Sequence, residues 1–247
     1  MIIRKSEEIK KQYHKLGSND TIIGIISSRY LKSHMLIDLL ERGVRCLPSP
    51  LSQTLNSSKV AQAFVFKEWM LPYTCVVNRR VDLIDSINQY NINNIGPSVT
   101  KEDHRHCGMG IKRWESIENV YSSMAMSKNL YPFIIQPFME NCTDVRVIIV
   151  DDYVEAYVRY NPNNFRKNIS MGGKSSVYNL DSKKEKFCRH IMERGKFPYA
   201  HIDIMILDND KYYLMEISLN GGIKGAKING QELDKKKQDF LEKLATT

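Results

Sequence analysis

The sequence predicts an α+β protein in which strands and helices mix without the regular alternation of a parallel α/β sheet. An apolar, isoleucine-rich run forms the first strand pattern, two hairpin patterns occupy the second half, and amphipathic helical spacings separate them. The 247 residues are 42% hydrophobic and 26% charged, a globular balance that excludes a disordered or coiled-coil chain. This length accommodates one large domain or two modest ones.

The first 55 residues contain a small β-α-β pattern. Residues 21–27 have the composition of a buried strand, residues 30–42 have the apolar spacing of a helix, and residues 44–47 form a second short strand. This unit is shorter than a full nucleotide-binding domain.

The middle of the chain continues with short helices and strands bounded by turn residues. We expect, in order, a helix over 56–70, a strand over 75–77, a helix over 81–90, strands near Val99 and over 111–114, a helix over 117–128 and a strand over 133–139.

The second half contains two hairpins and two further helices. The first hairpin pairs 144–150 with 153–160 through the turn Asp151-Asp152, and the second pairs 201–207 with 212–217. Helical spacing covers residues 182–194 and 231–244, and the latter segment is amphipathic.

Several sequence features exclude membrane and secreted classes. The longest apolar runs are far shorter than the roughly 20 residues that span a bilayer. The first eleven residues are charged and amphipathic and contain no signal-peptide core. The five cysteines are scattered and form no C-x-x-C pair, so we expect neither a disulfide framework nor a four-cysteine zinc site. We therefore expect a soluble, cytoplasmic protein with no membrane partner.

The formal net charge of +8 raises the question of nucleic-acid binding. The basic residues are dispersed, however, and the dense run over 234–239 includes acids, as a solvated helix face does. We expect no nucleic-acid partner, because a cleft that binds polyphosphate explains part of the charge more economically.

Two carboxylates of the second hairpin are candidates for a metal site. Asp203 interrupts an apolar strand and Glu216 ends the next one, so the two side chains can face each other across the hairpin. With Ser218 and Asn220 nearby, they form an oxygen-rich set that suits Mg²⁺. The alternative is that both acids lie at strand ends and face solvent.

Two loops carry groups that suit phosphate. Arg166 and Asn168 precede the pair Gly172-Gly173, which allows a close backbone approach to anionic oxygens or serves only as a surface turn. Lys101 precedes the loop 108–110, and a lysine followed by glycines can form a phosphate lid. A lone G-x-G motif is weak evidence for such a lid.

The order of these residues resembles the ATP-grasp superfamily, and the RimK-type amino-acid and peptide ligases in particular. The resemblance covers about residues 56–225 and is most specific between Gln136 and Gly173. It rests on Lys59, Lys101, the loop 108–110, Gln136–Met139, Asp144–Arg146, Arg159, Phe165–Asn168, Gly172-Gly173, His201–Asp203 and Glu216–Asn220.

The resemblance implies an ATP-grasp fold, in which two α+β subdomains clamp ATP, preceded here by a shortened β-α-β domain. The implied boundaries are 1–55 for the N-terminal domain, 56–135 for subdomain A with the glycine loop, and 136–247 for subdomain B with the metal site and the C-terminal helix.

The resemblance also implies roles for individual residues. Arg166, Asn168 and Arg159 would contact the γ-phosphate and the carboxylate that is activated. Asp203 and Glu216, with Ser218 and Asn220, would bind two Mg²⁺ ions, for which Mn²⁺ can substitute. The residues implied in ATP binding are Lys59, Lys101, Gly108, Gly110, Gln136, Phe138, Met139 and Asp144.

The implied activity is that of an ATP-dependent carboxylate–amine ligase acting on an amino acid or a peptide. The carboxylate becomes an acyl phosphate, which an amine then attacks to form an amide bond, while ADP and phosphate leave. The alternatives are the loading of an amino acid onto a carrier-protein thiol and a catalytically degenerate module that binds ATP without turnover.

Three departures from the family pattern and a short leading segment bear on these alternatives. Ser218 stands where an asparagine ligand is usual, Gly221-Gly222 replaces a proline-glycine pair, and Pro137 takes a hinge position often held by an acid. Only about 55 residues precede Lys59, so we expect an acceptor pocket that is reduced, open to a peptide or carrier protein, or completed by another subunit in a homodimer.

Overall fold

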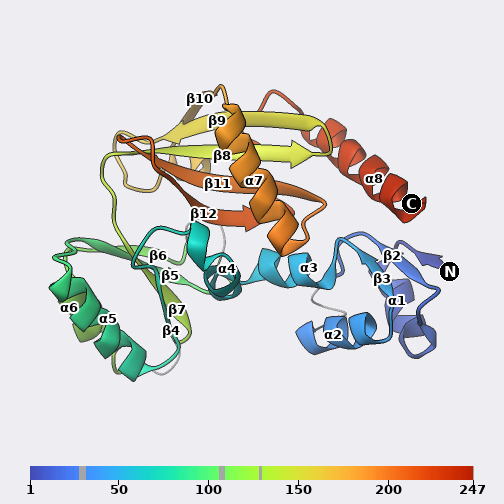
Figure 1. Cartoon of the computed structure of the whole chain (residues 1–247), viewed down its shortest axis with the longest axis horizontal. Helices are drawn as coiled ribbons and strands as arrows, with labels where there is room; N and C mark the ends of the chain where they lie inside the picture. The colour runs from blue at the N-terminus through green and yellow to red at the C-terminus, as the bar shows by residue number, and fades with distance from the viewer. Residues whose placement is uncertain (28–31, 106–108, 128–129, 247) are drawn as a thin grey trace.

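The computed structural model describes residues 1–27, 32–105, 109–127 and 130–246. Its strands form three separate sheets, each flanked by helices (Figure 1). This arrangement confirms the predicted α+β class.

The first sheet is parallel and has the strand order β1-β2-β3. Its strands are β1 (Ile2–Ile3), β2 (Thr21–Ile23) and β3 (Arg45–Leu47). Helices α1 (Ser6–Gln12) and α2 (Ser33–Glu41) bury Ile9, Leu36 and Leu39 against it. The strand and helix patterns of residues 21–47 predicted the second half of this unit, and they missed β1 and α1. Residues 28–31, which include the start of the predicted helix, lie outside the described residues.

The prediction of one helix over 56–70 is wrong. The structure has two helices, α3 (Pro50–Ser57) and α4 (Lys59–Val65), followed by a 3₁₀ turn at Lys67–Trp69. The reason is a pair of serine caps: the side chain of Ser49 accepts a hydrogen bond from the Ser52 amide and that of Ser58 from the Ala61 amide. Each capped helix therefore begins independently, and Lys59 lies in the first turn of α4.

The second sheet is antiparallel, with the order β4-β7-β5-β6. Two helices, α5 (Arg80–Ile92) and α6 (Ile117–Met124), bury Leu83, Tyr90 and Val120 at its core. The strands are β4 (Cys75–Val77), β5 (Ser98–Glu102), β6 (Ile111–Trp114) and β7 (Phe133–Pro137). These elements agree with the predicted ones, although α6 is shorter than the predicted helix.

The third and largest sheet is also antiparallel, with the order β10-β9-β8-β11-β12. Both predicted hairpins lie in it. The strands are β8 (Cys142–Val150), β9 (Tyr153–Tyr160), β10 (Lys174–Val177), β11 (Tyr199–Leu207) and β12 (Tyr212–Ser218). Strand β10, which pairs with β9 at the edge of the sheet, was not predicted from the sequence.

Helices α7 (Ser182–Gly195) and α8 (Gly230–Thr246) lie against the third sheet (Figure 1). Helix α8 also contacts β2 and β3, and the Arg4 guanidinium donates to both carboxylate oxygens of Glu242 at 2.7 Å. The last helix thus joins the first sheet to the third.

The division of the chain at residues 55 and 135 stays a prediction, since β7 runs across the second boundary. In the described part of the chain, no helix combines the length and the apolar character that crossing a membrane requires.

Candidate active site

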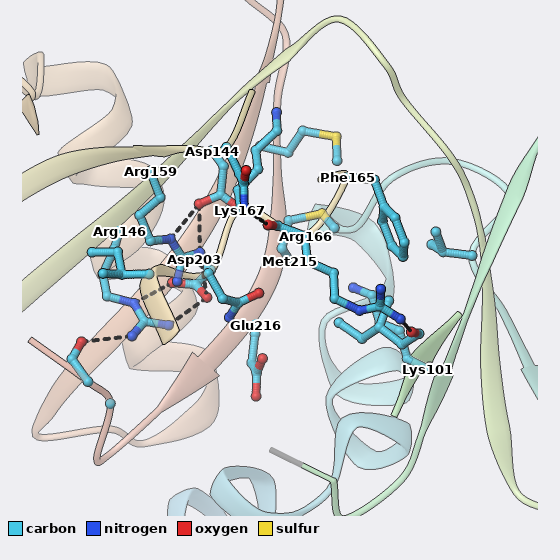
Figure 2. Close-up of a pocket in the computed structure, with 18 of the residues that line it drawn as sticks. Lys101, Asp144, Arg146, Arg159, Phe165, Arg166, Lys167, Asp203, Met215 and Glu216 are labelled. Carbon is cyan, nitrogen blue, oxygen red and sulfur yellow. Dashed lines mark hydrogen bonds and ion pairs between the residues drawn. The ribbon is translucent and has the colours of Figure 1, made fainter. Parts of the chain in front are cut away.

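A cleft of about 810 Å³ lies between the second and third sheets. Strands β5 and β6 line it on one side, and β8, β9, β11 and β12 line it on the other, with the loop 161–169 at its edge. Figure 2 shows the side chains of both walls converging on this space.

The register of the third sheet places polar side chains of four strands in one row. Asp203 on β11 pairs with Arg146 on β8 and with Glu216 on β12, and Arg146 pairs in turn with Tyr157 on β9. Because alternate residues of a strand share a face, His201 and Met205 lie on the same side as Asp203. All of these side chains line the cleft.

Two arginines converge on Asp203 (Figure 2). Arg146 donates to both carboxylate oxygens, at 2.7 and 2.8 Å, and Arg159 lies 2.9 Å from Oδ2. Arg159 also binds Asp144 at 2.6 Å, and the other end of the Arg146 guanidinium donates to the carbonyl oxygen of Gly222 at 2.9 Å. The network fixes the directions of both guanidinium groups.

The two carboxylates of this network have opposite electrostatic environments. Burial alone raises the pKa of the Asp203 carboxyl, but Arg146 and Arg159 outweigh this effect and hold that pKa well below its usual range. At Asp144 burial dominates and raises the pKa, because contact with Arg159 offsets it only in part. Asp203 is therefore the carboxylate that the arginines stabilise most.

Two lysines face Glu216 from the opposite wall. Lys59 Nζ lies 3.3 Å from Glu216 Oε1, and the buried Lys101 on β5 lies close enough for its charge to interact with that of Glu216. Burial lowers the pKa of Lys101 to about 8, an effect that the Glu216 charge offsets only in part. A buried ammonium group of this kind favours an anionic ligand, since such a ligand compensates the lost solvation.

The end of the cleft beside β7 is apolar and aromatic. Phe138 and Phe165 meet edge to face with their ring centroids 6.0 Å apart, and the Arg113 guanidinium lies 4.8 Å from the Phe138 ring. Met205 and Met215 line the same cleft from the third sheet. This end has the chemistry of a site for a flat, apolar ring.

The loop that carries Arg166 bridges the two walls. The Arg166 guanidinium stacks 4.3 Å from the Phe165 ring and donates to the carbonyl oxygen of Ile111 on β6. A Cβ at Gly173 would lie 2.8 Å from the carbonyl oxygen of Asn168, so this glycine permits the loop to fold back on itself. Gly173 therefore has a conformational role in this loop, and the phosphate contact stays a prediction.

The structure gathers most of the predicted site residues at this cleft. Gln136 does not line it: its side chain is buried in β7, with Nε2 3.7 Å from Met215 Sδ. Gly108 lies outside the described residues. The predicted residues that line the cleft are Lys59, Lys101, Gly110, Phe138, Met139, Asp144, Arg159, Arg166, Asn168, Asp203, Glu216, Ser218 and Asn220.

Several residues that line the cleft had no role predicted from the sequence. Arg146 is the most prominent, and its spacing from Asp144 on one strand was a usable signal, because residues two apart share a face. His201 is another; it stands two residues before Asp203. Burial lowers the pKa of His201 to about 3, and the charges of Lys237 and Arg146 act in the same direction.

The donor set partly fits a divalent cation. No cluster of three or more His, Cys, Asp or Glu side chains that could hold a metal ion occurs in the described ranges. The side chain of Glu216 is 34% exposed, and Lys59 is its only ion-pair partner among the residues that the structure describes, so its oxygens are accessible to a metal ion. Asp203 already binds two arginines, and its Oδ2 contacts both of them, so Oδ1 is the oxygen whose second lone pair could face a metal ion.

The comparisons with known proteins agree with this geometry. The RimK-like ATP-grasp domain matches residues 55–241. A coenzyme gamma-F420-2:alpha-L-glutamate ligase of Methanococcus maripaludis is 25% identical over 79% of this chain and 70% of its own length. A glutathione synthetase of Prochlorococcus marinus is 28% identical over 73% of this chain, and the match spans 60% of that relative.

The fold has counterparts among solved structures. The D-alanine–D-alanine ligase of Bacillus anthracis, solved with ATP, superimposes with a TM-score of 0.62 at 14% identity, over 98% of this chain and 82% of its own. This likeness confirms the ATP-grasp fold that the sequence predicted. Since the family match covers most of the chain, the protein is a member of the RimK-like ATP-grasp family of amide-forming ligases.

Proposed function

We propose that the protein is an ATP-dependent ligase that activates the carboxylate of an amino acid or peptide and joins it to an amine. The observation that carries this proposal is the order of chemistry along β11. Met205 lies toward the apolar end, Asp203 lies at the arginine network, and His201 lies beyond it. Such an order suits a nucleobase, then phosphates, then the group that receives the terminal phosphoryl group.

The nucleotide would lie with its base among Phe138, Met139 and Met205 and its phosphates between the two walls. Lys59 and Lys101 would neutralise the α- and β-phosphates, and the buried Lys101 gains most from such a contact. Gly110, just before β6, lines the cleft in this region. Arg166, which bridges the walls, would approach the γ-phosphate from the side opposite Asp203.

The metal would be Mg²⁺, held chiefly by Glu216 with Ser218 and Asn220 beside it and Asp203 on the adjacent strand. When bound, Mg²⁺ neutralises negative charge on the phosphates. Ser218 offers one hydroxyl where the family pattern has an amide, and Asp203 is bound by arginines. The set supports one ion better than two.

The reaction would proceed in two steps. A carboxylate oxygen of the substrate attacks the γ-phosphorus, the bond between that phosphorus and the β,γ-bridging oxygen breaks, and ADP leaves. The amine nitrogen then attacks the acyl carbon, the bond to the phosphate oxygen breaks, and phosphate leaves as the nitrogen loses a proton. Arg159, Arg166 and Asn168 would stabilise the charge that accumulates on the transferring oxygens.

The relatives support an amino-acid or peptide substrate, because their names describe a glutamate ligase and a glutathione synthetase. The carrier-protein thiol and the degenerate module remain as the competing hypotheses from the sequence. The homodimer also stays a prediction.

The test measures ADP release from Mg²⁺-ATP in the presence of pools of amino acids and dipeptides, with and without hydroxylamine. We expect one pool to stimulate ADP release and a hydroxamate of one carboxylate to accumulate, because hydroxylamine traps an acyl phosphate. Glu216→Gln is the matched control and should give neither product. Tight ATP binding with no ADP and no hydroxamate from any pool would contradict the ligase and favour the degenerate module.

A further inference from the structure

A buried histidine and a buried lysine meet behind the cleft. His201 on β11 is 2% exposed and Lys237 on α8 is 7% exposed. Lys237 Nζ lies 3.0 Å from His201 Nε2, 3.0 Å from the carbonyl oxygen of Leu219 and 3.4 Å from Asn220 Oδ1. The lysine therefore has three acceptors for its three protons.

This geometry determines which imidazole nitrogen carries the proton. The carbonyl and amide oxygens around Lys237 can only accept, so an ammonium group there donates to all three partners, and Nε2 of His201 is an acceptor. The proton of the neutral ring is then on Nδ1.

The Nδ1 proton has no partner in the described part of the chain, although the atom is buried. Buried donors are almost always bonded, so an orphaned one at the wall of a binding cleft indicates a ligand contact. Gly221 lies against this edge of the ring, where a Cβ would come within 3.0 Å of Nδ1 and of Cγ. Both His201 and Gly221 line the cleft.

The position along β11 identifies the ligand group. A strand rises about 3.3 Å per residue, so His201 lies about 7 Å beyond Asp203, on the side away from Met205 and the apolar end. If the base lies at Met205 and the phosphates lie near Asp203, the carboxylate that attacks the γ-phosphorus lies at this distance. Its oxygen is an acceptor, as an N–H donor requires.

We propose that His201 donates a hydrogen bond from Nδ1 to the substrate carboxylate, and that Lys237 positions it by holding the ring in the Nδ1-protonated tautomer. This inference deepens the proposed ligase function and rests on it. It names a substrate-contacting residue on β11 and a positioning residue on α8.

Two substitutions of His201 separate this role from a structural one. An asparagine amide can place its nitrogen near the position of Nδ1, whereas a glutamine amide reaches the position of Nε2 and can still accept from Lys237. We expect His201→Gln to lower kcat/KM for the stimulating carboxylate pool about 10- to 100-fold, which is the usual effect of losing one hydrogen bond to a charged group. His201→Asn should lose less than about 3-fold, and neither variant should change the affinity for Mg²⁺-ATP.

Thermal stability should rank the same variants in the opposite order. His201→Asn leaves Lys237 without one acceptor and should melt at a lower temperature than His201→Gln. If His201→Gln kept full activity while His201→Asn lost it, the histidine would serve only to bind Lys237, and the proposal would be overturned. Gly221→Ala provides a third variant, since its methyl group obstructs Nδ1 and should lower kcat/KM without changing ATP affinity.

The tautomer itself can be observed without any turnover. In ¹⁵N-labelled protein with Mg²⁺ and a non-hydrolysable ATP analogue, the resonance that His201→Gln removes should show a protonated Nδ1 and a bare Nε2. Lys237→Met should shift it to the Nε2-protonated form. A wild-type Nε2–H signal would refute the proposal even if the ligase were active, whereas an Nδ1–H signal in a protein that no pool stimulates would count against the ligase function alone.

Discussion

Replacing Asp203 by asparagine should destabilise the folded protein far more than the same change at Asp144. Asp203 is the shared acceptor of Arg146 and Arg159, and its side chain is only 10% exposed. Removing its charge leaves Arg159 with Asp144 as its remaining carboxylate partner and leaves Arg146 with no carboxylate in ion-pair contact within the described part of the chain. The substitution therefore measures how much folding free energy is lost when buried charges are left without a partner.

The magnitude follows from the geometry. Breaking a buried, well-bonded ion pair by removing one partner costs about 3–5 kcal/mol. For a chain of this length, that corresponds to a fall in the melting temperature of about 6–20 °C. Asp144→Asn should cost less than about 1 kcal/mol, because burial already raises the pKa of this carboxyl and the fold does not favour its charged form.

Urea unfolding of the three proteins at pH 7 measures these differences as shifts of the midpoint at constant slope. The low pKa of Asp203 in the folded state means that its contribution is present above the unfolded-state value of about 3.9 and is lost as pH falls. The gap between wild type and Asp203→Asn should therefore narrow below pH 4. Equal destabilisation by Asp203→Asn and Asp144→Asn, or a gap that does not change with pH, would refute this reasoning.

Four further outcomes can be checked with the same proteins and assays. Glu216→Gln should lower ADP release at least about 100-fold with little change in melting temperature, because the side chain is partly exposed; retained activity would remove Glu216 from the metal site. The stability of the wild type should rise by up to about 3 kcal/mol between pH 8 and 10.4, because in this range Lys101 keeps its proton in the unfolded chain and loses it in the folded one. Lys101→Met should lack this rise, and identical profiles of stability against pH for the two proteins would contradict the low pKa of Lys101. Arg166→Ala should lower kcat more than it weakens ATP binding, and an effect on ATP affinity alone would remove Arg166 from the transferring phosphoryl group. Ser218→Asn should leave ADP release within a few-fold of wild type, whereas a large gain would favour a partly degenerate site.

The parts of the fold that the sequence predicted are those with strong local signals. The turn at Asp151-Asp152 joins two alternating strands, and the hairpin formed as expected, with Asp151 in a left-handed conformation. The split between α3 and α4 was missed because the apolar spacing continues across Ser58, and only the cap geometry at Ser49 and Ser58 reveals two starts. Strand β10 was missed because residues 174–177 are mostly exposed and carry no apolar alternation.

The residues of the candidate site also fall into two groups, those with a local sequence signal and those placed by long-range contacts. Asp203 and Glu216 could be assigned in advance to adjacent strands of one hairpin, but the register that follows from the turn would pair Asp203 with Met215, and a bulge between Asp203 and Ile204 brings Glu216 opposite Asp203 instead. The roles of Arg146 and of Lys237 depend on contacts between segments far apart in the chain. Lys237 lies 36 residues from His201 on an amphipathic helix, where a lysine ordinarily faces solvent, and no local pattern distinguishes it from its neighbours Lys235 and Lys236.

The double attachment of α8 has a consequence for biosynthesis. Ribosomes add about 5–20 residues per second, so some 2–7 s separate the synthesis of Asp203 from that of Lys237. Until α8 has docked, the inner end of the His201 ring and the side of β2 and β3 that α8 contacts are uncovered. Mutations that slow the docking of α8 would therefore lengthen the period in which apolar surface is open to chaperones or to aggregation.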